Sequence, residues 1–269
     1  MTHPSPVPTF SAQAGPADFF QGLALLVRAW GLVFRSPRLL GLSALCALVT
    51  LVALGALIYF LWGQTSELLG WLWTRPEPWY GGALWDVLRL LLFLVLLVVG
   101  ANITLPLVLA PLQDPLSEIT EELCGDYTSP PFRVGPFLRG LVTSVAHTLA
   151  RIFFLLAGLA LLFPLNLIPV AGSVAWTVLG TLWTMLWLAG EHLAAPMTRH
   201  GYSFAEVRKA MRQRWLLCLG FGLGVYFLLW IPILNTFFLP VAVIGGTLLY
   251  RGLRAVGQVA PPPSVALGK

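Results

Sequence analysis

Charged residues are scarce in this chain of 269 residues. Only 10% of the residues are charged and 58% are hydrophobic, whereas a soluble domain has about 25% charged residues. The mean hydropathy is +0.83. This composition excludes an ordinary soluble domain and indicates an integral membrane protein of the all-α class, because long apolar runs are the signature of membrane helices.

Cysteine and histidine are also sparse, which argues against several kinds of site. Cys46, Cys124 and Cys218 are far apart, so their spacing indicates neither a disulfide framework nor a metal site. The four histidines are scattered. The pair Glu191-His192 is best explained as the end of a hairpin at the membrane interface, and no serine or cysteine nucleophile lies in a recognisable motif. We therefore expect no metal, no cofactor and no enzymatic activity.

The basic residues indicate topology rather than a nucleic-acid partner. The net charge is +5, which in so apolar a chain says little about nucleic acid. Basic residues collect before the first span, in the 199–214 segment and after the second hairpin, while the loop 63–86 holds three acids and only Arg75. The positive-inside rule therefore predicts that both termini are cytoplasmic.

The chain ends are predicted to lie outside a single membrane domain. Residues 1–16 are rich in proline and serine, so we expect disorder there, and they lack the pattern of a signal peptide. A proline-rich tail occupies 257–269. The membrane domain is predicted to span 17–256.

The first half of the domain is predicted to hold an interfacial helix and two spans. Apolar residues at helical spacing form one stripe of an amphipathic helix: Phe19, Leu23, Leu26, Trp30 and Val33. Ser36 followed by Pro37 is a helix-start signal. About 24 uncharged residues then run from Leu39 to Trp62, enough to span a bilayer. The second span is predicted at 87–106, with Arg89 near its end, where it can reach the interface.

A short helix is predicted to follow the second span. Asp114 and Pro115 form its start signal, and an apolar stripe follows at Leu116, Ile119 and Leu123. The glutamates of this helix, Glu118, Glu121 and Glu122, are expected on a solvated face. A paired-carboxylate catalytic site is a weaker alternative, because no other group completes an acid–base site.

A polar stripe recurs every four residues on the next predicted helix. It consists of Arg139, Thr143, His147 and Arg151. Two interpretations are equally open: a basic face turned toward lipid headgroups, or the lining of an anion path.

Two apolar runs are interrupted by residues that break helices. Residues 152–162 and 174–189 flank a segment with two prolines, and 216–230 and 236–250 flank a second break. Arms of about 11 to 16 residues are shorter than the roughly 20 needed to cross a bilayer. They predict two re-entrant hairpins, with tip residues Asn166, Pro169, Gly172, Pro232 and Asn235; the alternative is two pairs of proline-kinked spans.

Between the hairpins lies a predicted basic surface helix. Ser203 and Glu206 form a capping box. An apolar stripe (Phe204, Val207, Met211 and Trp215) is predicted to lie opposite a basic face, which consists of Arg208, Lys209, Arg212 and Arg214. This pattern is typical of a helix on a membrane surface.

The order of these motifs resembles the CysZ-type sulfate permeases and the etoposide-induced EI24 proteins. The matching segments are Gly22, Pro37-Arg38-Leu39-Leu40, Ala110-Pro111 with Asp114, Leu116 and Glu118, Leu123-Cys124-Gly125, Leu167-Ile168-Pro169-Val170-Ala171-Gly172, Tyr202-Ser203-Phe204 with Arg208, Phe221-Gly222, Ile231-Pro232-Ile233-Leu234-Asn235, and Leu239-Pro240-Val241-Ala242-Val243 with Gly245.

This resemblance implies two long transmembrane helices, two hemi-penetrating hairpins and sulfate movement across a bacterial inner membrane for cysteine synthesis. It implies an anion site at the start of the first long helix, where Arg38 matches best, after Ser36 and Pro37. The family motif has a glycine-containing turn and often adjacent arginines, whereas proline and one arginine stand here. The competing function is a membrane scaffold that does not transport. Because four short arms do not obviously enclose a pore, we expect a homo-oligomer in the lipid bilayer.

Overall fold

The computed structural model describes residues 6–74, 79–125, 153–229 and 232–261. These ranges are helical, with short turns and no strand. Within these ranges, four helices are long and apolar enough to cross a membrane: Ala17–Arg35, Pro37–Leu72, Gly81–Leu109 and Ala171–Arg199. The chain is thus an all-α membrane protein, as the composition predicts. Whether the hairpins are re-entrant stays a prediction.

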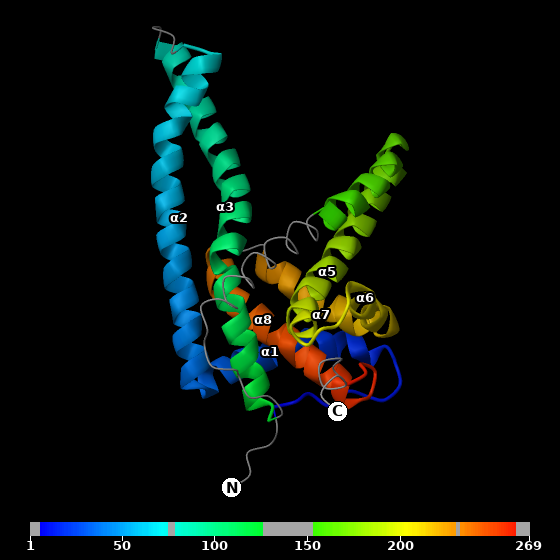
Figure 1. The fold of residues 1–269 in the computed structure, drawn as a ribbon. Helices are drawn as coiled ribbons and strands as arrows, with labels where there is room; N and C mark the ends of the chain where they lie inside the picture. Colours follow the sequence, from blue (N-terminus) through cyan, green and yellow to red (C-terminus); the bar gives the residue numbers. More distant parts are fainter. Residues whose placement is uncertain (1–5, 75–78, 126–152, 230–231, 262–269) are drawn as a thin grey trace. The chain divides into compact units, whose positions relative to one another are not determined.

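The described chain forms two compact units. The smaller unit, residues 45–110, contains most of α2 (Pro37–Leu72) and of α3 (Trp79–Leu123) (Figure 1). Its two helices are joined by Arg89, whose Nη2 donates to the Trp62 carbonyl over 3.0 Å and whose guanidinium lies 4.6 Å from the Trp62 ring centroid. Tryptophan and arginine are thus paired across this unit.

Both long helices continue beyond their predicted ends. Helix α2 reaches Leu72, because no proline interrupts it after Trp62. Helix α3 runs unbroken over 45 residues, so the separate helix start predicted at Asp114 is wrong. A proline removes one backbone donor and bends a helix without ending it when the flanking hydrogen bonds remain. Pro115 is such a residue within α3.

The larger unit comprises residues 1–44 and 111–269, of which the described ranges are given above. Its core packs α1 (Ala17–Arg35) against α7 (Trp215–Leu229) and α8 (Pro232–Ala255), and α5 (Ala171–Arg199) against α7 and α8. Glycine permits the closest approach. A Cβ atom at Gly220 would collide with the Phe19 carbonyl.

The buried face of α1 is rotated from the predicted stripe. Leu26 and Val33 are buried as predicted, but Leu23 and Trp30 are each 37% exposed. The small residues Gly22 and Ala29, with Leu25, complete the buried face. The spacing of hydrophobic residues predicts bulky side chains on the buried face of α1. The close packing of α1 against its neighbours instead requires small residues on that face.

Part of the amino-terminal segment is packed where the sequence predicts disorder. The Phe10 side chain is buried and lies over Gly252 of α8. The backbone carbonyls of Ser11 and Gln13 accept hydrogen bonds from Arg214. A proline-rich composition therefore did not reveal these long-range contacts.

The first hairpin breaks where the prolines predict. A helix begins at 153 and gives way to the short 3₁₀ helix η1 (Phe163–Leu167), and α5 starts at Ala171. Val170 adopts a φ of 61°, the left-handed region that β-branched residues rarely occupy. The two arms lie side by side, since Trp183 Nε1 donates to the Leu155 carbonyl over 3.4 Å (Figure 1).

The arms around both breaks are longer than predicted on one side. Helix α5 has 29 residues, not the 16 expected for 174–189. Helix α8 already begins at Pro232, so Asn235 belongs to its first turn and not to an interruption. Proline is well tolerated at the first helical position, so Pro232 opens α8 where the sequence predicts a break. Residues 230–231 lie outside the described ranges.

Candidate functional site

The predicted anion site lies at the junction of α1 and α2. Ser36 caps both helices: its backbone N–H donates to the Leu32 carbonyl, and its Oγ accepts from the Leu39 N–H over 3.5 Å. Pro37 is the first residue of α2. The predicted helix start is confirmed. The Ser36 side chain thus fixes the helix end, and Arg38 follows on the first turn.

Arg38 is accessible but has a carboxylate beside it. Its side chain is 78% exposed, and Nη1 lies 3.7 Å from Oε2 of Glu122, near the end of α3. A helix N-terminus favours an anion through free N–H groups and the helix dipole. The Glu122 carboxylate already lies beside the Arg38 guanidinium. An oxyanion at Arg38 would therefore compete with Glu122.

Glu121, the residue before Glu122, is the centre of a buried charge cluster. The Glu121 side chain is 0% exposed, with Arg199 Nη2 3.1 Å from Oε1 and His200 Nε2 2.8 Å from Oε2. Arg199 also donates to Ser117 Oγ over 3.0 Å and to the Asp114 carbonyl over 3.2 Å. The end of α5 is thereby fixed to the end of α3.

The cluster extends to α8. The hydroxyls of Ser117 and Thr247 share a buried hydrogen bond of 2.8 Å. The His200 ring stacks on Tyr250 with centroids 5.5 Å apart. Three helices therefore meet through polar side chains that are mostly buried, and such groups are costly to bury unless they are partnered.

The expected solvated face of glutamates is wrong for Glu121. Its buried carboxylate is held between Arg199, the last residue of α5, and His200, the residue that follows, and both partners lie far away in the sequence. Glu118 is half-buried, and desolvation raises its carboxyl pKa above the ordinary value, with the nearby Arg199 acting in the opposite direction. The apolar stripe also differs: Leu116 is buried while Leu123 is 40% exposed.

Two adjacent glutamates thus hold two arginines in different environments. Glu121 pairs with Arg199, whose side chain is only 16% exposed, and Glu122 pairs with the exposed Arg38. The guanidinium of Arg199 is occupied by contacts with Glu121, Ser117 and the Asp114 carbonyl. Arg38 is the member of the two that an incoming anion can reach.

One of the four residues predicted for the basic face of α6 (Phe204–Gln213) is buried instead of exposed. The capping box is present, with Ser203 N–H donating to Glu206 Oε2 over 2.6 Å. Arg208 and Lys209 are exposed as predicted. Arg214 is buried, because its Nη1 pairs with Asp18 Oδ2 at 2.6 Å. Helical periodicity predicts that Arg214 lies on the surface, but its ion pair with Asp18 of α1 holds it in the interior.

The other predicted site residues fall elsewhere. Asn166 lies in η1, Pro169 is exposed beside it, and Gly172 is buried in the first turn of α5. The backbones of Pro232 and Asn235 belong to the first turn of α8. The predicted polar stripe lies outside the described residues; it consists of Arg139, Thr143, His147 and Arg151.

Sequence reasoning missed most of the buried charge. Glu121, Arg199 and His200 occur at the ends of apolar helices, where cations are usually assigned to headgroups. Asp18 is the one acid in the first turn of α1. A lone charge beside an apolar stripe is a signal for a buried partner, but the sequence does not say which residue that is.

Comparison with known proteins identifies relatives over nearly the whole chain. The family model described as "Sulfate transporter CysZ/Etoposide-induced protein 2.4" matches residues 25–240. A protein named Sulfate transporter CysZ from Pseudomonas paraeruginosa is 29% identical over 255 residues, 93% of this chain and 98% of the relative. One of the same name from Vibrio parahaemolyticus is 26% identical over 80% of this chain and 88% of its own length. Another from Pseudomonas fluorescens is 32% identical over 56% of this chain and 60% of its length.

The family model covers well over half of the chain, in the region that holds Arg38, α2, α3, the first hairpin, α7 and the start of α8. The relatives are named as transporters. The chain belongs to the Sulfate transporter CysZ/Etoposide-induced protein 2.4 family.

Proposed function

We propose that this protein conducts sulfate, or an oxyanion of similar charge and shape, across a bacterial inner membrane. The observation that carries the proposal is the family match over residues 25–240, with bacterial relatives named as sulfate transporters. Helices long and apolar enough to span a bilayer fit the setting. Supply of sulfate to cysteine synthesis is the role that follows for the cell.

Arg38 is the proposed first contact of the anion. It is exposed near the start of α2, and a guanidinium can hold two oxygens of one oxyanion. When the anion binds, it takes the place of the Glu122 carboxylate beside Arg38. The arginine is therefore paired with a negative group both before and after binding. Pro37 contributes no N–H, and the Ser36 hydroxyl can still donate its proton.

The translocation path is proposed to run along a stripe of basic and hydroxyl side chains. The candidates are Arg139, Thr143, His147 and Arg151, whose spacing places them on one helix face. The proposal includes a homo-oligomer, because the short hairpin arms expected from the sequence do not obviously enclose a pore. Both termini are proposed to be cytoplasmic, following the distribution of basic residues.

The proposal is tested by uptake of radioactive sulfate into proteoliposomes that contain the purified protein. We expect uptake above that of protein-free vesicles, and competition by unlabelled sulfate. A pH gradient across the vesicles distinguishes proton-linked uptake from passive flux. If correctly folded protein gives no uptake with or without the gradient, the transport proposal is wrong and the scaffold function takes its place.

A further inference from the structure

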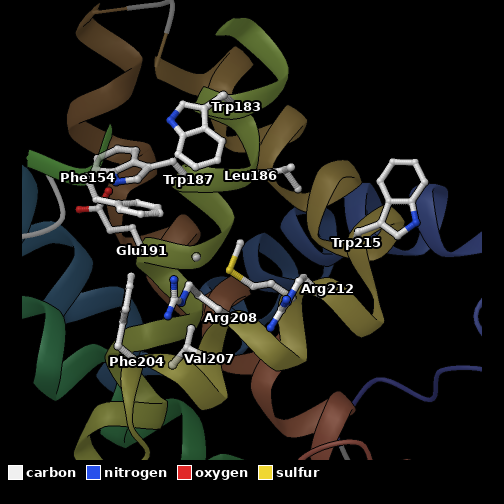
Figure 2. A pocket seen from close by; sticks show the side chains of 12 residues that line it. Phe154, Trp183, Leu186, Trp187, Glu191, Phe204, Val207, Arg208, Arg212 and Trp215 are labelled. Carbon is white, nitrogen blue, oxygen red and sulfur yellow. The ribbon is translucent and has the colours of Figure 1, made fainter. Parts of the chain in front are cut away.

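A pocket of about 450 Å³ lies between α5 and α6 in the larger unit. The walls come from the first arm of the hairpin, from α5, from α6 and from the start of α7 (Figure 2). The described contacts of Arg38, Glu121 and Glu122 involve none of its lining residues. The pocket is therefore separate from the site that is proposed to receive sulfate.

One side of the pocket is aromatic. Phe154 and Trp183 have ring centroids 5.3 Å apart, and Phe154 meets Phe204 edge to face at 5.9 Å. Trp187 lies beside them (Figure 2). These rings and the Met211 thioether make the cavity predominantly apolar, which suits hydrocarbon.

The other side carries two arginines. Arg208 and Arg212 line the pocket on successive turns of α6, and both are exposed to solvent. The Arg208 guanidinium carbon lies 5.0 Å from the Phe204 ring centroid, so a stacking contact orients it. Glu191 is the acidic group in the lining. Two cations against one carboxylate leave a net positive edge on an aromatic cavity.

Along α5 the exposure of the large side chains changes beside the pocket. On α5 the large apolar side chains Val174, Val178 and Leu182 are exposed, and Met185 is the first large side chain that is buried. The pocket residues of α5 start at Trp183, at this boundary. Tryptophan is enriched where membrane hydrocarbon gives way to headgroups.

We propose that this pocket binds one anionic phospholipid. Arg208 and Arg212 would hold the phosphate, as arginine does through two parallel hydrogen bonds, and the aromatic wall would take the glycerol end and the start of an acyl chain. A cavity of about 450 Å³ is within the usual size range of ligand pockets, roughly 300 to 1,000 Å³. A small inorganic anion would leave most of the apolar wall uncovered.

The proposal is tested with the full purified chain in detergent by native mass spectrometry. The probes are phosphatidylglycerol, phosphatidylcholine with the same acyl chains, and soluble glycerol phosphate. We expect one phosphatidylglycerol to be retained in preference to phosphatidylcholine, with little competition from glycerol phosphate. Arg208→Ala with Arg212→Ala should weaken retention about 30-fold, since each basic group near an anionic lipid is worth about 1 kcal/mol.

Two further variants separate a pocket from general attraction to charge. Lys209→Ala removes a neighbouring exposed cation that does not line this pocket, and it should leave retention unchanged. Leu186→Trp fills the cavity while keeping both arginines, and it should abolish retention with the thermal midpoint preserved.

Five outcomes overturn the proposal. Among the variants, they are an equal loss in Lys209→Ala, unchanged retention in the Arg208/Arg212 double variant, and unchanged retention in a folded Leu186→Trp protein. Among the probes, they are equal retention of phosphatidylcholine and full competition by glycerol phosphate, which would identify a free-phosphate site. None of these measurements depends on sulfate transport.

Discussion

Arg214 and Asp18 form an ion pair of 2.6 Å in which both side chains are almost completely buried. They lie nearly 200 residues apart in the sequence. Arg214 also donates from Nε to Gln258 Oε1 over 2.8 Å and to the backbone carbonyls of Ser11 and Gln13. One guanidinium therefore joins the amino-terminal segment, α1 and the turn that follows α8.

Removing one member of this pair should destabilise the fold strongly. Arg214→Gln leaves the Asp18 carboxylate buried without its cation, which costs about 3 to 5 kcal/mol. We expect the thermal midpoint in detergent to fall by roughly 10 °C. Lys209→Gln is the matched control, because Lys209 is exposed on α6, and its midpoint should barely change. Equal midpoints for the two variants would show that the pair contributes nothing.

The competition between Glu122 and substrate predicts opposite effects on sulfate binding. Arg38→Ala should weaken binding about 10- to 100-fold, the range for a lost charged hydrogen bond. Arg38→Lys should weaken it less, since the charge stays but the planar fork is lost.

Glu122→Gln should tighten sulfate binding, because it removes the carboxylate 3.7 Å from Arg38. Isothermal titration of the detergent-solubilised protein measures all three variants. If Glu122→Gln and Arg38→Ala both bind as the parent does, the anion site lies elsewhere, and the stripe from Arg139 to Arg151 is the next candidate.

The raised pKa of Glu118 predicts a dependence of stability on pH. Burial disfavours its charged form, so the folded protein binds the proton more tightly than the unfolded chain. The resulting destabilisation is absent below the ordinary carboxyl pKa, appears as pH rises through the folded pKa, and persists at neutral pH.

Glu118→Gln should therefore raise the thermal midpoint at pH 7, and its advantage should shrink as pH falls toward 4.5, the ordinary value. Thermal scans of parent and variant across this range measure the difference. A variant that is less stable than the parent at pH 7 would mean that the attraction between Glu118 and Arg199 outweighs desolvation.

The exposed part of the first hairpin still predicts a re-entrant segment, although α5 is long. The outer part of α5, residues 171–184, has about 14 residues and is roughly 21 Å long at 1.5 Å per residue, shorter than a hydrocarbon core of about 30 Å. From Met185 onward α5 is largely buried in the protein.

Single cysteines at Asn166 and Asn235, in a background without the three native cysteines, should resist an impermeant thiol reagent applied outside intact cells. A cysteine placed at Glu67, which is exposed near the end of α2, should react and serves as the positive control. Rapid labelling of both tips from outside would require full spans.

How far the sequence predicts this molecule depends on the range of the interactions. The Ser36–Pro37 start, the capping box at Ser203 and the break at η1 are set by neighbouring residues, and they were predicted. The unbroken course of α3 through Pro115 was not, because a start signal and a tolerated proline look alike in sequence.

The charged groups show the same division. Arg38 is predicted as an anion contact from its position next to a helix start and from family resemblance, and this role stays a prediction. Arg214 was assigned to the surface and Glu121 to solvent, because helical periodicity gives a face but not the residue opposite it. Their partners, Asp18 and Arg199, come from helices distant in the chain, and only the folded arrangement reveals them.

The fit of α1 against α7 through Gly22 and Gly220 has a consequence for biosynthesis. About 180 residues separate the end of α1 from the start of α7, and a ribosome making roughly 5 to 20 residues per second needs about 10 to 40 s to synthesise them. During that interval the nascent α1 has an apolar face and the acid Asp18 but neither α7 nor Arg214 to cover them. The growing chain must therefore keep α1 at the membrane surface or in the insertion machinery until its last third emerges, and nascent chains that end before α7 should be the ones that quality-control proteases remove.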